Sequence, residues 1–200
     1  MNELDFSVNL HPENAAMILH WEQLMLHYGP TMGAHRPRFE AAGQTTYGLL
    51  CCRYSPMEDQ LGYSSGAHAE AHLLRSAVWT THIPNALRQW TPHDSPIIVT
   101  LALNRSPCQN CTALLIDALS ALYRDFPDRG PRNRFILAAK GAYEDAGMVT
   151  CTTQNDLIRL RDAGWELCVL QVGPNLSARG QILLEGIERV AGRGFVRLHG

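Results

Sequence analysis

The chain has 200 residues, of which 46% are hydrophobic and 18% are charged, and its formal net charge is −2. This composition excludes disordered and collagen-like chains, and the near-neutral charge excludes a protein that binds nucleic acid mainly through a strongly basic surface. No apolar run reaches the ~20 residues of a membrane span, and the acidic N-terminus lacks the basic and then apolar pattern of a signal peptide. We therefore expect one soluble domain over residues 1–200, without a membrane partner.

Up to the middle of the chain, apolar periodicity and turn residues predict helices and strands separated by polar loops. These elements are a helix over 12–28, a short strand over 36–40 that forms a hairpin with a strand over 44–54, a polar loop over 55–65, and a helix that begins near Gly66. Pro84 and Pro92 indicate a further loop. The almost continuous apolar run 96–103 then predicts a strand buried on both faces.

Beyond that strand, helices and strands alternate to the end of the chain. The predicted elements are a helix from Ser106 to about Tyr123, a strand over 134–140, a helix over 153–163 ended by Gly164, a strand over 165–172 and a helix over 177–191. Strands separated by such helices are parallel neighbours joined by right-handed crossovers. The pattern therefore predicts an α/β protein with three layers, α/β/α. Its core spans about 36–192, and residues 1–35 form an N-terminal helix and a connection.

Two short motifs lie at the starts of predicted helices: His-Ala-Glu at 68–70 and Pro-Cys-Gln-Asn-Cys at 107–111. Cys108 and Cys111 are three residues apart, so on a helix they face the same way and can bind one metal ion. His68 supplies a third ligand. One imidazole and two thiolates suit Zn²⁺ and leave a fourth position for water, as a catalytic zinc site requires.

Glu70 follows His68 by two residues, which turns it roughly 200° around the helix, so it is not expected to be a fourth ligand. It is instead placed to take a proton from water and to deliver it to a substrate nitrogen, as a general base and then a general acid. The alternative interpretation is a redox or buried cysteine pair with a coincidental histidine. A zinc-protease helix is excluded, because His-Glu-x-x-His requires the glutamate directly after the first histidine.

His-x-Glu followed by Pro-Cys-x-x-Cys resembles the signature of the zinc-dependent cytidine-deaminase-like superfamily. Ser-Pro-Cys-x-x-Cys with histidine as the first ligand is similar to the AID/APOBEC-like branch and to the bacterial toxin deaminases related to it. Residues 135–145 resemble the fourth strand and following loop of that branch, and 156–170 resemble its next helix and fifth strand. The resemblance covers about 45–172 and implies a five-stranded mixed sheet in which strands 4 and 5 are parallel.

The resemblance implies a zinc-dependent hydrolytic deaminase that converts cytosine to uracil in single-stranded DNA. In such a site, main-chain groups of Ala67 and Ser106 hold the pyrimidine edge, and Tyr143 is the first candidate for stacking on a base, with Tyr63 the second. Arg105 occupies the position before Ser-Pro-Cys where the vertebrate branch has an aromatic residue, which favours the bacterial toxin relatives. We accordingly expect a toxin-type domain that acts as a monomer in the cytoplasm of the producing or recipient cell, with an immunity or inhibitor protein as a further partner.

Two other classes of function stay open at this point. One is a deaminase of free nucleosides or nucleotides, of RNA, or of double-stranded DNA. The other is a non-catalytic, zinc-stabilised binding protein. Glu70 argues against the second alternative, because a purely structural zinc site has no use for an acid beside the metal.

Overall fold

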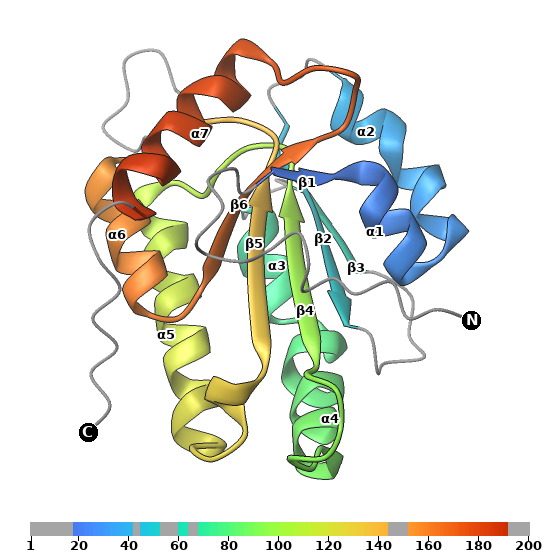
Figure 1. The fold of residues 1–200 in the computed structure, drawn as a ribbon, viewed down its shortest axis with the longest axis vertical. Helices are drawn as coiled ribbons and strands as arrows, with labels where there is room; N and C mark the ends of the chain where they lie inside the picture. The colour runs from blue at the N-terminus through green and yellow to red at the C-terminus, as the bar shows by residue number, and fades with distance from the viewer. Residues whose placement is uncertain (1–17, 42–44, 53–59, 64–67, 144–151, 192–200) are drawn as a thin grey trace.

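The computed structural model describes residues 18–41, 45–52, 60–63, 68–143 and 152–191 (Figure 1). Their strands form a single sheet in the order β1-β6-β5-β4-β2-β3. The strands are β1 (Ile18–His20), β2 (Tyr47–Cys52), β3 (Gln60–Tyr63), β4 (Ile98–Leu103), β5 (Arg134–Ala139) and β6 (Glu166–Gln171). The α-helices are α1 (Trp21–Tyr28), α2 (Arg36–Glu40), α3 (Ala69–Leu74), α4 (Ile83–Gln89), α5 (Gln109–Asp125), α6 (Gln154–Asp162) and α7 (Ala178–Ala191).

The strand directions confirm the predicted fold class. β2 is antiparallel to both β3 and β4, whereas β4, β5 and β6 are mutually parallel. The predicted five-stranded mixed sheet is therefore present as β3-β2-β4-β5-β6, with its last two strands parallel. β1 adds a sixth, short strand at the β6 edge, also parallel.

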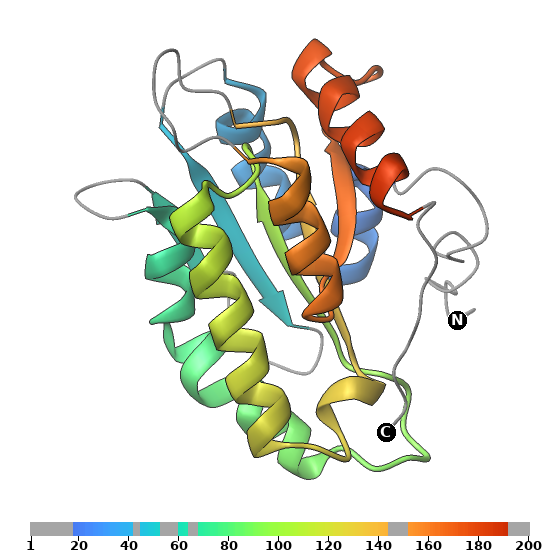
Figure 2. The same cartoon turned by 90° about the vertical axis from the view of Figure 1, so that its left-hand side faces the viewer.

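Helices cover both faces of the sheet, because the strands in its centre are apolar on both sides. All six residues of β4 are buried: Val99, Leu101 and Leu103 join the core under α3 to α7, and Ile98 and Ala102 join the core under α1 and α2. Figure 2 shows α5 and α6 in front of the strands and α1 behind them. The three-layer α/β/α arrangement follows directly.

The larger core contains a cluster of aromatic rings between α5, β5 and the helices that flank them. Trp79 stacks on Trp165 with ring centroids 6.1 Å apart, and Phe135 meets both rings edge-on at 6.4 Å and 6.3 Å. These side chains bury large apolar areas and dominate the packing of this layer. Among the described helices, none combines the length and the apolar character that crossing a bilayer would need.

The predicted N-terminal helix is only partly correct. Residues 1–17 lie outside the described part of the chain, and Ile18–His20 is a strand, so the helix begins at Trp21. The periodicity of the apolar residues favours a helix, but hydrogen bonding to the edge of β6 overrides it, with Leu19 paired to Leu170.

Three other local predictions were wrong. The strand expected over 36–40 is helix α2, which has Pro37 in its first turn and an Arg36–Glu40 ion pair along it. The loop expected over 55–65 contains β3, whose pairing with β2 could not be inferred locally. Pro84 lies in the first turn of α4, which continues directly from the π-helical turn Val78–His82, so this proline is part of a helical segment and not of a loop.

Helix α6 begins and ends where the sequence predicts. Thr153 caps it: the Asp156 N–H donates to the Thr153 hydroxyl at 3.2 Å, and the Thr153 N–H donates to the Asp156 carboxylate at 3.0 Å. After the helix, Gly164 has φ +106°, and a Cβ there would lie 2.8 Å from Oη of Tyr123. The Tyr123 ring is itself packed edge-on against Phe135.

Gly164→Ala is therefore expected to lower the free energy of unfolding by ~1–3 kcal/mol, since it combines an unfavourable positive φ with a close approach to a packed ring. Urea denaturation followed by circular dichroism measures this change. Gly173→Ala is the matched control, because an added Cβ there meets nothing within 4 Å. Equal midpoints for the two variants would contradict the prediction.

Candidate metal centre

The site lies at one edge of the sheet, and the strand directions explain why. β3 and β4 flank β2, are both antiparallel to it and therefore end at the same edge: Tyr63 pairs with Tyr47, and Leu103 pairs with Gly48. α3 follows β3 in the chain, and α5 follows β4. The N-termini of both helices are consequently brought together at this edge.

His68, Cys108 and Cys111 meet at these two helix starts. His68 and Cys108 are the N-cap residues of α3 and α5, both with extended backbone, and Cys111 lies one turn into α5. Nδ1 of His68 is 3.3 Å from Sγ of Cys108 and 3.2 Å from Sγ of Cys111, and the three ligand atoms all lie within 4.8 Å of one another. The three side chains could hold a metal ion.

The donor atoms fit zinc in type and in spacing. Zn–S bonds of about 2.3 Å and Zn–N bonds of about 2.0–2.1 Å at tetrahedral angles separate sulfur and nitrogen by roughly 3.5 Å. The observed separations are a few tenths of an ångström shorter, so a small opening of the three side chains would admit the ion. His68 is exposed while both cysteines are buried, so the imidazole is the solvent-facing member of the triad.

The thiols of Cys108 and Cys111 lie close enough to change each other's acidity. A hydrogen bond from the Cys111 thiol lowers the pKa of Cys108 to about 5, and the nearby Cys108 thiolate and burial raise the pKa of Cys111 above its usual value. Cys108 is thus the more acidic of the two thiols. A divalent cation bound to both sulfurs would replace their protons, because thiolates and not thiols ligate metals. By contrast, Cys168 is a buried core thiol whose pKa is raised to about 12 by desolvation.

Glu70 is buried beside this triad in the first turn of α3. Its side chain is 2% exposed, and Oε2 has no hydrogen-bond partner among the described residues. Burial raises the pKa of Glu70, and the charge of Cys108 raises it further. A buried carboxyl oxygen without a partner is costly unless a further group binds there, which fits an ion or a water held by the triad.

The structure brings three of the predicted substrate-binding residues together next to Cys108. The guanidinium carbon of Arg105 lies 5.9 Å from the centroid of the Tyr143 ring. Between them, Ser106 is buried: its N–H donates to the Gly141 carbonyl at 2.8 Å, and its Oγ accepts the Tyr143 N–H at 2.9 Å. Ser106 therefore fastens the segment after β5 to the start of α5.

The other two predicted substrate residues are not placed. Ala67 lies outside the described residues, and Tyr63 is placed only as the last residue of β3, its side chain not being described. Thr152 was not predicted as a site residue, yet its hydroxyl is 2.7 Å from Oγ of Ser106 and donates to the Pro107 carbonyl. Thr152 is more than forty positions further along the chain and belongs to no local motif, so only the folded chain reveals its contact with the site.

Comparison of the sequence with known protein-family models gives no match, and comparison with curated proteins gives none either.

Removing one sulfur ligand should abolish zinc binding. We expect Cys108→Ala to lose affinity for Zn²⁺ by more than the ~10–100-fold that changes around the ligands of a metal site produce. The measurement is the zinc content of purified protein after dialysis, by inductively coupled plasma mass spectrometry. Cys168→Ala, which also removes a buried thiol, is the control and should keep its zinc. A Cys108→Ala protein that retains a full equivalent would refute the ligand assignment.

Proposed function

We propose that the chain is a zinc-dependent hydrolytic deaminase that converts cytosine to uracil in single-stranded DNA, as a bacterial toxin-type domain. The observation that carries the proposal is the buried Glu70 carboxyl, with one oxygen unpartnered among the described residues, next to a His-Cys-Cys triad of zinc-ligand type. A redox pair of cysteines would need neither the imidazole at 3.2–3.3 Å from both sulfurs nor the buried acid. A structural zinc site has a closed set of four protein ligands, whereas this triad offers three.

In the proposed reaction, the overall change is cytosine plus water to uracil plus ammonia. Zinc held by His68, Cys108 and Cys111 would supply Lewis-acid activation of the water. Glu70 takes a first proton from the water and gives it to ring nitrogen N3 as the oxygen bonds to C4, and it then carries the remaining proton of that oxygen to the amino group. The C4–N4 bond breaks, ammonia and uracil are released, and the enzyme ends the cycle in its starting protonation state. The burial of Glu70 favours this role, because a carboxyl group out of bulk water holds a proton more readily than an exposed one.

The Arg105–Tyr143 pair supports a polynucleotide substrate. The pair lies at the start of α5, joined to Cys108 through Ser106 and Pro107. An aromatic face can stack on a base, and an arginine can pair with a phosphate of the same strand. Single-stranded DNA is the favoured form, because its bases reach a pocket without the cost of leaving a duplex stack.

Glu70→Gln tests the proposed acid–base role. The amide keeps the shape of the side chain but cannot carry the proton, so we expect conversion of cytosine in a mixed-sequence single-stranded oligonucleotide to fall by ~10²–10⁴-fold. Conversion is scored by sequencing, together with zinc content and thermal midpoint, which should stay close to wild type. Glu185→Gln, an exposed carboxylate on α7, is the matched control.

Wild-type turnover by Glu70→Gln would show that Glu70 has no catalytic role. If the wild-type protein carries zinc and converts no cytosine in this oligonucleotide, the single-stranded DNA proposal is wrong. Parallel assays on RNA, duplex DNA and free cytidine would then identify which of the other deaminase substrates is used.

Tyr143→Ala tests the proposed stacking. Loss of one base–aromatic contact costs ~1–3 kcal/mol, so we expect the Kd for a single-stranded oligonucleotide to rise roughly 5–150-fold. Tyr143→Phe keeps the ring and should bind within about twofold of wild type. Fluorescence anisotropy at constant salt measures both variants, and equal affinities for them would contradict the stacking role.

A further inference from the structure

The segment that carries Tyr143 follows β5 directly and is held from several sides. On one side, Ser106 accepts the Tyr143 N–H and donates its own N–H to Gly141. On another side, the Ala142 N–H donates to the Arg179 carbonyl at 3.0 Å. Gly141 packs so closely on the turn that begins α7 that a Cβ there would lie 2.8 Å from Cβ of Arg179. Each of these contacts uses the main chain of the segment.

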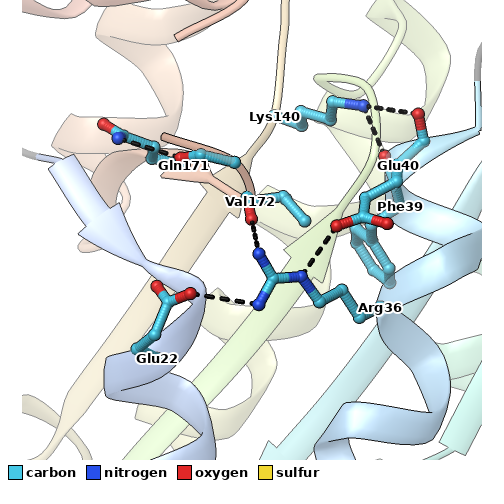
Figure 3. Close-up of polar contacts among 8 residues, drawn as sticks. Glu22, Arg36, Phe39, Glu40, Lys140, Gln171 and Val172 are labelled. Carbon is cyan, nitrogen blue, oxygen red and sulfur yellow. Dashed lines mark hydrogen bonds and ion pairs between the residues drawn. The ribbon is translucent and has the colours of Figure 1, made fainter. Parts of the chain in front are cut away.

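A further anchor is the side chain of Lys140, the residue immediately before this segment. Its ammonium donates to the carbonyl oxygens of Phe39 at 2.5 Å and Glu40 at 3.2 Å (Figure 3). These carbonyls lie at the C-terminal end of α2, where the helix leaves carbonyl groups without intrahelical partners and where a cation is favoured. Lys140 is also the only lysine in the chain, which otherwise uses arginine for its basic residues.

The helix that receives Lys140 is itself fixed to the sheet. Arg36 pairs with Glu40 at 2.7 Å and with Glu22 of α1 at 3.1 Å, and it donates to the Val172 carbonyl just after β6 at 2.6 Å (Figure 3). Phe39 is fully buried against Trp21, with ring centroids 5.0 Å apart. α2 therefore gives Lys140 a firmly held partner instead of a mobile surface turn.

We infer that Lys140 is a positioning residue. It fastens the segment Gly141–Tyr143 to the N-terminal layer, which consists of α1 and α2, and so sets where Tyr143 meets the nucleic acid. The inference rests on the proposed function for its link to substrate, although the fastening itself is a property of the chain alone. Lys140 touches neither the metal ligands nor Glu70 in the contacts described above, so its effect is on binding and orientation of substrate and not on the proton transfers.

The test compares Lys140→Met, Lys140→Arg and Arg129→Met with the wild-type protein. Methionine keeps the length of the stem and loses the donors, whereas arginine keeps a cationic donor. Arg129→Met is the matched control, because Arg129 likewise donates to a carbonyl near the C-terminal end of a helix, that of Leu87 in α4 at 3.0 Å, and none of the contacts above links it to the segment Gly141–Tyr143. Each variant is first checked for zinc content and thermal midpoint.

Hydrogen exchange by mass spectrometry gives a readout that needs no activity. We expect Lys140→Met to exchange the amides of residues 141–143 at least ~10-fold faster than wild type, since one anchor of the segment is lost. Lys140→Arg should restore most of the protection, and Arg129→Met should leave this segment protected. Unchanged exchange in Lys140→Met, no restoration by arginine, or equal deprotection in Arg129→Met would each overturn the inference.

Steady-state kinetics on single-stranded DNA then connects the fastening to function. Lys140→Met is expected to raise KM by ~3–10-fold with kcat within about twofold, the pattern of lost substrate positioning without damage to the chemical groups. A fall in kcat with unchanged KM would overturn the assigned role. If the wild-type protein shows no deamination at all, the proposed function fails, while the exchange data still decide whether Lys140 holds the segment.

Discussion

The whole candidate site depends on one feature of the sheet, the antiparallel strand β2 between β3 and β4. Because both neighbours run opposite to β2, they end at the same edge, and the helices that follow them start there together. β5 is parallel to β4 and ends at this edge too, with Ala139 paired to Leu103. Three parts of the chain that are far apart in the sequence therefore meet at this edge. The first carries His68 and Glu70, the second carries Cys108 and Cys111, and the third carries Tyr143.

The chemistry of the triad and Glu70 forms one electrostatic unit. Two cysteine sulfurs, an imidazole and a buried carboxyl group lie close together, and each carries charge or polarity that would be costly to bury unless opposed. A divalent cation would compensate the negative sulfurs and give the unpartnered Glu70 oxygen a neighbour to act on. The same low polarity that makes this arrangement costly strengthens each electrostatic interaction inside it.

The N-terminal layer has a role beyond covering the second face of the sheet. Its apolar side chains fill the core beneath α1 and α2, and its polar groups make the contacts of Arg36 and Lys140. The ends of β5 and β6 are consequently tied to the same short helix. Through Lys140 this layer reaches the residues next to the candidate metal centre, which links a part of the chain without catalytic motifs to the proposed recognition of substrate.

Local patterns in the sequence determined the metal-ligand spacing of Cys108 and Cys111, the pairing of His68 with Glu70, the buried strand β4 and the three-layer class, since each depends on periodicity or residue type within a few positions. The tertiary structure alone decided that Ile18–His20 is a strand and that Lys140 joins α2 to the site. Their partners lie about one hundred or more positions away along the chain, and no local pattern encodes a contact whose hydrogen bonds and packing form only when the sheet assembles.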